Sequence, residues 1–334
     1  MAIQVAQSGP IVRSNPGLGR HRVRNPRGTT SQLLPLPPAS VTAAPRIIRS
    51  DIPSVQLSPD DLTNALFEGD CLHWLPAFPD ASVDMVLCDL PYGTTRNPWD
   101  SVVPLEKLWR QYQRVVKPRG AIVLTSQGLF TAKLIMSQER LFRYKLSWEK
   151  SKPTNFLNVR RQPLRKHEDV CVFYRRQPLF NPQMGEGEPY DKGVRKNQLS
   201  GSYGDFVPAH VKSAGGRFPT DVVYFKTAES EGTGEVWHPT QKPVALGRYL
   251  VRTYTKPGDL VLDNAFGSGS FLVSSVLEGR RFVGIEKNRE GRLFKRNPVD
   301  YVALAAKRIR EAQQILTAGR MHRSRPSSLD TFDE

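Results

Sequence analysis

The chain has 334 residues, of which 39% are hydrophobic, so it can bury the core of one large α/β domain or two modest domains, which excludes a wholly disordered protein. Its formal net charge of +16 predicts a polyanionic partner, either nucleic acid or an acidic membrane surface. No apolar run approaches the ~18 residues of a membrane span. The three scattered cysteines show no C-x-x-C spacing and indicate a reducing compartment without disulfides or structural zinc. We therefore predict a cytoplasmic protein without a membrane partner.

The start of the chain is basic and rich in proline. Residues 1–50 contain seven Arg, seven Pro and no acidic residue. This composition cannot bury a core, so we predict that residues 1–60 form a disordered basic arm. An Arg-rich, acid-free start also resembles an organelle transit peptide, but the proline spacing breaks any amphipathic helix and favours a solvated arm.

From about residue 61 the pattern becomes globular. Short apolar runs have the length of buried strands at 82–88, 120–126, 168–174, 259–265 and 281–287. Helical patterns follow at 104–116, 242–255 and 271–279, and a last helix repeats Val302, Ala305, Ile309, Ala312 and Leu316 at spacings of three and four. Alternating strands and helices predict a mostly parallel sheet with helices on both faces.

One interval breaks this alternation. Residues 177–237 are rich in Gly, Pro, Asn and Ser and contain one strong strand candidate, at 221–225, so we predict a small inserted module there. From residue 318 we expect a flexible tail. The predicted organisation is an arm (1–60), a first half-domain (61–176), the insert (177–237), a second half-domain (238–317) and the tail (318–334).

A glycine-rich turn joins the strand that ends at Asp263 to the helix at 271–279. Such a turn lets the backbone approach a ligand at the carboxyl edge of a sheet. It is not a dinucleotide fingerprint, because Leu272 stands where G-x-G-x-x-G needs glycine. Glu286 ends the next strand, 23 residues after Asp263, at the usual position of a ribose acceptor. The alternatives are a site for a nucleoside-containing cofactor and a purely structural turn.

A second unusual stretch, DLPYGTTRNPWD, follows the strand at 82–88 directly. It places a carboxylate, a rigid proline turn and an aromatic ring at the carboxyl end of a buried strand. The two stretches together resemble the S-adenosylmethionine-dependent amino-methyltransferases of DNA.

Four motifs carry the resemblance, which covers about residues 66–310. The catalytic motif (D/N/S)-P-P-(Y/F/W) is matched by Asp89-Leu90-Pro91-Tyr92, and the cofactor motif F-x-G-x-G is matched in part by Ala265-Phe266-Gly267-Ser268-Gly269. The segment 148–173 is similar to the family's segment that ends in His-Glu and a strand, and HPTQKPV (238–244) is similar to its cofactor-side helix start. The order of the motifs is that of the β group.

The resemblance implies a Rossmann-like methyltransferase fold: a central, mostly parallel seven-stranded sheet with helices on both faces, plus a small target-recognition insert. It also implies S-adenosyl-L-methionine as cofactor and no metal. Leu90 replaces the first proline of the catalytic motif, but Pro91 still restricts Leu90 to an extended conformation. Ala265 stands where the cofactor motif has Phe, so we expect Phe266 to pack on the cofactor.

The catalytic residues implied are Asp89, Leu90, Pro91 and Tyr92. An exocyclic amine is a poor nucleophile because its lone pair is delocalised into the ring. Acceptors on both N–H bonds, the Asp89 carboxylate and the Leu90 carbonyl, would localise that lone pair. The target is inaccessible in a duplex, so the base must be flipped out, and Tyr92 is the expected stacking surface.

The cofactor residues implied come from four segments. Asp263, Gly267 and Gly269 would shape the methionine pocket, Glu286 would bind the ribose and Asp70 the adenine amine. Ala265, Phe266 and Ser268 complete the glycine turn, and His238, Thr240, Gln241 and Lys242 would hold the cofactor carboxylate at a helix start. The alternatives are a helix-capping Asp70 and a structural His238.

Basic residues are concentrated in one segment of the chain. Residues 140–176 contain eleven Lys/Arg against three acidic residues, an excess of +8, whereas 177–237 contain six against eight. We assign phosphate binding to Lys150, Lys152, Arg160, Arg161, Arg165 and Lys166. Base readout would fall to the insert, with candidates Arg195, Lys196, Asn197, Gln198 and Arg217.

The favoured function is a site-specific N6-adenine methyltransferase acting on double-stranded DNA, with an N4-cytosine enzyme of the same fold as the alternative. Asp at the first motif position favours adenine, since Ser is commoner for cytosine. A glutamine or RNA methyltransferase would usually place the cofactor motif first, and an inactive DNA-binding protein is the alternative of another class. A homodimer and a separate restriction endonuclease are left open as partners.

Overall fold

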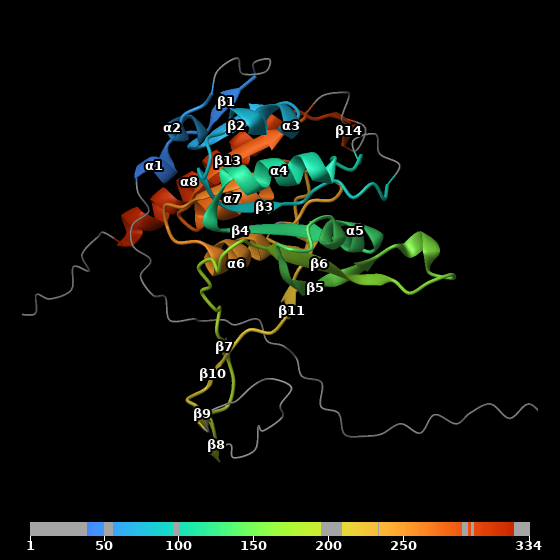
Figure 1. Ribbon diagram of the computed structural model, residues 1–334, viewed down its shortest axis with the longest axis vertical. Helices are drawn as coiled ribbons and strands as arrows, with labels where there is room; N and C mark the ends of the chain where they lie inside the picture. Colours follow the sequence, from blue (N-terminus) through green and yellow to red (C-terminus); the bar gives the residue numbers. More distant parts are fainter. Residues whose placement is uncertain are drawn as a thin grey trace, which may run out of the picture. The chain divides into compact units, whose positions relative to one another are not determined.

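The computed structural model describes residues 39–49, 56–95, 100–194, 209–232, 234–288, 293–294 and 297–323. Within these residues, nine strands form the central sheet in the order β1-β2-β13-β12-β3-β4-β6-β5-β11 (Figure 1). The strands are β1 (Arg46–Ile48), β2 (Ala65–Glu68), β3 (Val83–Cys88), β4 (Val116–Ser126), β5 (Phe142–Thr154), β6 (Arg165–Phe173), β11 (Val222–Phe225), β12 (Leu260–Asp263) and β13 (Arg281–Glu286). Every pairing is parallel except those of β6 with β4 and β5.

The mostly parallel sheet confirms the predicted fold class, although it is wider than the predicted seven strands. The edge strands β1 and β11 extend it, by parallel pairing with β2 and β5 respectively. Both are short, and neither has the long apolar run of a central strand. Their places depend on the neighbouring strands, since a sheet edge offers unpaired backbone groups to any extended segment that reaches it.

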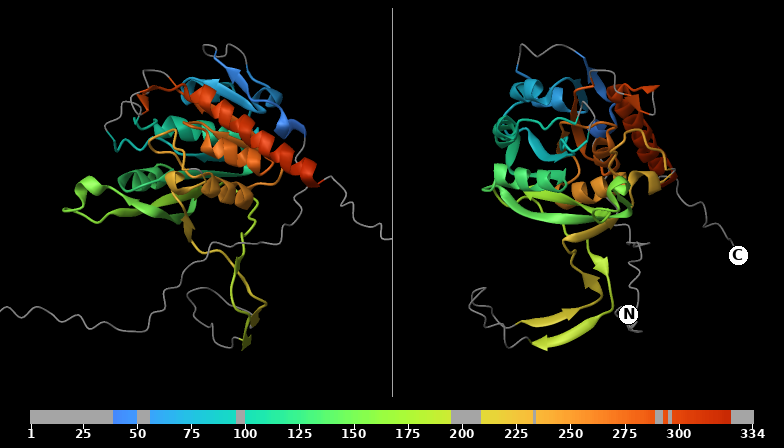
Figure 2. Two further views of the ribbon diagram at one scale, coloured as in Figure 1. Left: turned by 180° about the vertical axis from the view of Figure 1, so that it is seen from behind. Right: turned by 90° about the vertical axis from the view of Figure 1, so that its right-hand side faces the viewer.

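Helices cover both faces (Figure 2). They are α1 (Ala39–Thr42), α2 (Pro59–Leu62), α3 (Cys71–Trp74), α4 (Leu105–Val115), α5 (Leu129–Ser137), α6 (Val244–Tyr254), α7 (Ser270–Leu277) and α8 (Tyr301–Arg323), with 3₁₀ turns η1 (Leu75–Ala77), η2 (Phe156–Asn158) and η3 (Ala228–Ser230). Alternate residues of β3 face opposite ways: Val86 packs in the cluster that includes α3, α4 and α5, and Leu87 in the cluster that includes α6. A strand buried on both faces explains why 82–88 is almost continuously apolar.

The boundary of the N-terminal arm needs a correction. Residues 39–49, predicted to be disordered, contain α1 and β1. The side chain of Val41 is fully buried, and Gln313 of α8 donates hydrogen bonds to the carbonyls of Val41 (3.0 Å) and Ala43 (2.8 Å). These contacts lie more than 250 residues apart in the chain, so local composition could not show them.

The insert also differs from its predicted limits, because β11 belongs to the large sheet. The other described strands of 177–237 form two-stranded antiparallel ladders, one of β7 (Gly185–Glu186) with β10 (Gly216–Arg217) and one of β8 (Tyr190–Val194) with β9 (His210–Ser213). A further antiparallel pair joins β14 (Leu293–Phe294) to β15 (Asn297–Pro298).

Candidate active site

The Asp89 carboxylate directly follows β3 at the carboxyl edge of the sheet. Its Oδ1 accepts hydrogen bonds from the Tyr92 hydroxyl (2.7 Å) and from Thr125 Oγ1 at the end of β4. Its Oδ2 accepts from Lys242 Nζ at 2.6 Å. A carboxylate has about four acceptor positions, so the described contacts orient this group firmly and leave acceptor capacity on Oδ2.

Lys242 connects Asp89 to a second carboxylate. Its Nζ lies 3.4 Å from Oε2 of Glu168 on β6, while Glu168 Oε1 lies 3.2 Å from Lys150 Nζ on β5. Burial by itself lowers the pKa of Lys242, but the charges of Asp89 and Glu168 outweigh it and raise the pKa above its usual value. Lys242 therefore stays charged, in an alternating chain of Asp89, Lys242, Glu168 and Lys150.

Tyr92 lies against Phe130 of α5, with ring centroids 5.0 Å apart, and Lys242 Nζ lies 5.5 Å from its ring centroid. Burial, and then the charges of Asp89 and Glu168, raise the pKa of Tyr92 well above its usual value. The hydroxyl therefore stays protonated and donates to Asp89. Leu90 is buried in the hydrophobic cluster against which Tyr92 packs.

The turn after Tyr92 is held by another carboxylate. Asp100 accepts from the backbone N–H groups of Gly93 (2.8 Å), Thr94 (2.9 Å) and Thr95 (2.6 Å). Gly93 has φ of +67°, which favours glycine at this position. The stretch DLPYG therefore folds as a tied turn at the end of β3.

Three of the predicted cofactor elements meet at the ends of β2, β12 and β13. Glu286 is buried at the end of β13, and its Oε2 accepts from Gly267 N at 2.8 Å. Its carbonyl accepts from Gly69 N at 2.9 Å, next to Asp70. The Asp70 side chain accepts from Leu72 N at 2.9 Å and caps α3, as the alternative interpretation expected.

The glycine turn is constrained by packing as well as by its conformation. Gly267 and Gly269 have φ of +50° and +78°. A Cβ on Gly269 would lie 2.8 Å from Ala305 Cβ of α8, so a larger residue there would push the helix away. Ser268 is buried between them.

Two assignments in this region need correction. Phe266 does not face the predicted ligand edge: its ring lies in the hydrophobic cluster with Leu66 and Leu272, whereas Ala265 borders the cluster on the other face of the sheet. The start of α6 is also occupied, because the Glu231 carboxylate accepts from Val244 N (2.7 Å) and Ala245 N (2.6 Å). Those N–H groups are not available to a cofactor carboxylate.

The rest of the segment before α6 is tied internally. His238 is buried beside Gly267, its Nδ1 accepts from Thr240 N at 3.2 Å, and its ring packs edge-on against Tyr301. Gln241 Oε1 accepts from Trp237 N at 2.9 Å. Of the four residues assigned to the cofactor here, Lys242 makes its contacts with Asp89 and Glu168 instead.

Asp263 ends β12 inside the protein. Burial raises its pKa to about 8, while hydrogen bonds from the Cys88 thiol and from Ala265 N lower it. This carboxyl group lies against the sheet edge between the Asp89 and Glu286 carboxylates, whose charges both act on it.

The predicted phosphate ligands separate into two groups. The assignment of Lys150 is wrong, because its side chain is 2% exposed and pairs with Glu168. The others are exposed on the hairpin of β5 and β6: Lys152, Arg160, Arg161, Arg165 and Lys166. Of these, Lys166 pairs with Glu149 at 2.9 Å.

Of the candidate base-reading residues, Arg217 is among those that the structure describes. Arg217 lies over the Tyr190 ring, 4.7 Å from its centroid, and donates to the Glu188 carbonyl and to Ser213. Arg195, Lys196, Asn197 and Gln198 lie outside the described residues.

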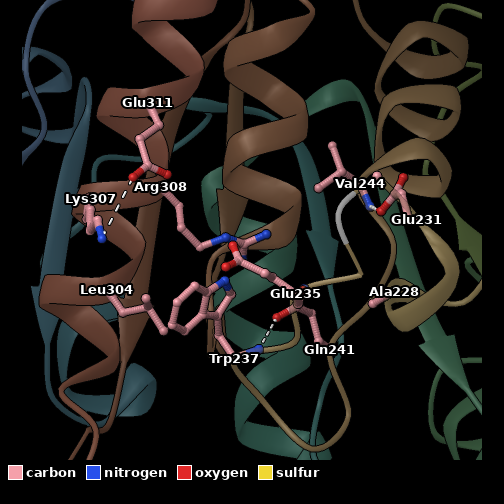
Figure 3. A pocket seen from close by; sticks show the side chains of 11 residues that line it. Ala228, Glu231, Glu235, Trp237, Gln241, Val244, Leu304, Lys307, Arg308 and Glu311 are labelled. Atoms are coloured by element: carbon pink, nitrogen blue, oxygen red, sulfur yellow. Dashed lines mark hydrogen bonds and ion pairs between the residues drawn. The ribbon is translucent and has the colours of Figure 1, made fainter.

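A separate cavity of about 440 Å³ lies between α8 and the segment 228–244 (Figure 3). Lys307 and Glu311 of α8 line it and pair at 3.9 Å, and Trp237 lies opposite them. Gln241 also lines it, but neither Asp89 nor Glu286 does. The cavity is thus distinct from both carboxylate sites.

Sequence reasoning missed Thr125, Glu168 and Glu231. Glu168 carried a signal, because it belongs to the His-Glu pair of the 148–173 segment. Thr125 and Glu231 carried none, since their roles depend on which segments pack together. In the described parts of the chain, no cluster of three metal-binding side chains occurs and no helix is both long and apolar enough to cross a bilayer.

A mostly parallel sheet with a carboxylate–proline–tyrosine turn at one strand end and a glycine turn at the next defines a methyltransferase of the Rossmann-like class. Residues 83–292 match the family model of the N6/N4 DNA methylases, and the chain belongs to that family. It is 27% identical over 269 residues to the Type II methyltransferase M.BglII of Bacillus subtilis, covering 70% of this chain and 68% of that protein. Its fold is similar to that of the PvuII DNA methyltransferase (cytosine-N4-specific), with a TM-score of 0.51 and 16% identity over 83% of this chain and 96% of that chain.

The protein is therefore a DNA methyltransferase, and its family uses S-adenosyl-L-methionine as methyl donor. The residues present fit this donor. A ribose needs a hydrogen-bond acceptor, and the donor's sulfonium and ammonium groups favour nearby negative charge. The carboxyl edge of the sheet carries the carboxylates of Asp70, Asp89 and Glu286, and Glu286 contacts the glycine turn through Gly267 N.

Proposed function

We propose that the protein methylates the N6 amine of adenine at a specific site in duplex DNA. The observation that carries the proposal is the carboxylate at position 89, which retains acceptor capacity on Oδ2 while donors from three segments fix its plane. S-Adenosyl-L-methionine supplies an electrophilic methyl group when bound. The task of this chain is then to orient the amine and to stabilise the positive charge that develops on its nitrogen.

Asp89 and Leu90 divide that task. One N–H of the amine would donate to Asp89 Oδ2 and the other to the Leu90 carbonyl, which draws the lone pair out of the ring. Lys242, Thr125 and Tyr92 hold the carboxylate in place before the base arrives, so little reorganisation is needed during the reaction.

The base must leave the duplex to reach this position. We assign the grip on the DNA to the exposed cations of the β5–β6 hairpin, and base readout to the insert. The residues proposed for the cofactor are Glu286 for the ribose, Gly267, Ser268 and Gly269 for close backbone approach, and Asp70, Asp263 and His238 beside them.

The likeness to a Type II methyltransferase supports a restriction-modification role. A separate endonuclease that recognises the same site would be the partner. The expected observation is that DNA methylated by this protein resists cleavage by that endonuclease.

The decisive experiment incubates the protein with labelled S-adenosyl-L-methionine and mixed-sequence duplex DNA, followed by digestion to nucleosides. Label in N6-methyldeoxyadenosine supports the proposal, and sequencing of the labelled fragments gives the site. Label in N4-methyldeoxycytidine would establish the cytosine alternative. Duplex binding without any label would establish an inactive DNA-binding protein.

The matched control is Asp89→Ala. We expect this variant to transfer no detectable label and to bind the cofactor with nearly unchanged affinity, measured by calorimetry, because Asp89 lies at the amine position and not in the glycine turn. Transfer by the variant at a near wild-type rate would refute the mechanism.

A further inference from the structure

The hairpin of β5 and β6 carries exposed apolar side chains at its tip. In Figures 1 and 2 the hairpin extends past α5, beyond the body of the sheet. At the tip the exposed fractions are 63% for Phe156, 101% for Leu157 and 57% for Val159. A cluster of large apolar side chains with so little cover is unusual for a surface that meets only water.

The surroundings of this tip are strongly cationic. Residues 152–166 contain five Lys/Arg and no acidic residue. Repulsion between such charges opposes contact with a second copy of this tip, whereas a polyanion would be attracted to it. Apolar side chains followed directly in the chain by the exposed Arg160 and Arg161 match the chemistry of DNA, with phosphates outside and stacked bases inside.

The tip is shaped in advance of any contact. Asn155 has φ of +74° and its Oδ1 accepts from Asn158 Nδ2 at 2.8 Å. Arg161 N then donates to the Asn158 carbonyl at 2.8 Å. These bonds close the turn η2 and keep Phe156 and Leu157 at its outer end.

The base of the hairpin lies in the candidate active site. Lys150 of β5 and Glu168 of β6 belong to the charge chain that ends at Asp89. Between Lys150 and Thr154 the strand is bulged, because Glu149 pairs with His167 and Thr154 with Arg165, and Lys150 Nζ donates to Thr154 Oγ1 at 3.1 Å. The tip therefore begins directly beyond the charge chain, so a duplex gripped by this hairpin would lie close to Asp89.

We propose that Phe156 and Leu157 form an apolar wedge that inserts into the base stack and holds the duplex open while the target base is flipped. The wedge stabilises the gap by substituting apolar contact for the base stacking that flipping disrupts. This inference rests on the proposed function, since it needs a base to be extruded.

The test compares two duplexes that contain the mapped methylation site. In one the target base is paired, and in the other an abasic position stands opposite it, so that extrusion is already easy. For the Phe156→Ala/Leu157→Ala variant we expect the single-turnover rate on the paired duplex to fall about tenfold or more. On the abasic-opposed duplex we expect a rate within about twofold of wild type.

The matched control is Met136→Ala/Ile315→Ala, which removes two apolar side chains that are 69% and 65% exposed on α5 and α8. It should leave both rates unchanged. The salt dependence of duplex affinity should stay the same in both double variants, since neither changes a charge.

Equal losses on both duplexes, or no loss on either, would overturn the wedge. Wild-type binding to anionic vesicles that the tip variant loses, with unchanged methylation, would reassign the tip to a lipid surface and overturn it too. Failure of the proposed function would look different, because the wild-type protein would then label neither duplex.

Discussion

The Asp89 carboxylate receives donors from its own turn, from β4 and from the segment before α6. In the proposed mechanism this carboxylate is oriented by its donors and keeps an acceptor position for the substrate amine. Among these donors Lys242 is the charged one, and its separation of 2.6 Å from Oδ2 is that of a charge-assisted hydrogen bond. We therefore expect the loss of Lys242 to slow the methyl-transfer step.

We predict that Lys242→Met lowers the single-turnover transfer rate about tenfold or more, because Asp89 loses the donor that fixes Oδ2. The dissociation constant of S-adenosyl-L-methionine should change less than about twofold. Stopped-quench kinetics and calorimetry measure the two quantities. A normal rate with strongly weakened cofactor binding would instead support the role that the family resemblance assigns to Lys242.

The raised pKa of Asp263 predicts that the stability of the fold depends on pH. Burial raises its pKa from 3.8 to about 8 in the folded protein. Between these values the folded state holds a proton that the unfolded state has released, so the free energy of unfolding decreases as pH rises from about 4 to about 8. Below this range both states are protonated, and above it neither is.

The Asp263→Asn variant removes this titration and keeps a side-chain oxygen for Ala265 N. We expect its free energy of unfolding to vary less with pH between about 4 and 8 than that of wild type. Urea unfolding at several pH values measures the difference. A pH dependence identical to that of wild type would show that Asp263 is ionised in the fold.

At the scale of elements, the β5–β6 hairpin carries both the cations proposed for the DNA grip and part of the candidate active site. Its strands carry the buried Lys150 and the half-buried Glu168 at the base, while Arg160 and Arg161 are exposed near the tip. In the proposed mechanism, this hairpin would couple binding of the DNA backbone to positioning of the base.

We predict that Arg160→Ala/Arg161→Ala weakens cognate and scrambled duplexes by similar factors. The slope of log affinity against log salt should also fall by about 0.9 for each phosphate-binding side chain that is removed, because one fewer counterion is released. A salt titration on both duplexes measures this. The control Lys107→Ala/Arg110→Ala removes two exposed cations from α4 and should keep the wild-type slope, and an unchanged slope for the arginine pair would place those side chains in solvent.

For the whole molecule, the correction at residues 39–49 has a consequence for stability. β1 forms one edge of the sheet, and the carbonyls of Val41 and Ala43 accept hydrogen bonds from Gln313 of α8. We predict that deleting residues 1–49 lowers the melting temperature compared with deleting residues 1–38, because the longer deletion exposes the edge of β2 and leaves Gln313 without its acceptors. Equal melting temperatures in calorimetry would show that α1 and β1 add no stability.

The sequence by itself determined the parts that depend on neighbours in the chain. The apolar runs at 82–88 and 281–287 became β3 and β13, and the helical patterns at 104–116 and 271–279 became α4 and α7 within one or two residues. Asp89, Pro91 and Tyr92 lie in one turn because they belong to four consecutive residues, 89–92. Burial on both faces makes such segments continuously apolar, and that signal is local.

The tertiary structure alone decided the contacts between distant segments. Lys242 contacts Asp89, which lies 153 positions away in the chain. β11, predicted to belong to the insert, pairs at the edge of the large sheet. Lys150, predicted to bind phosphate, is buried against Glu168. β5 has alternating charged residues, which is the pattern of a surface segment, yet it is an inner strand of the sheet because β6 and β11 pair with it on either side. The order of the strands in the sheet determines these partners. Side chains can form an ion pair, and strands can form a ladder, only where that order makes them neighbours, however far apart they lie in the chain.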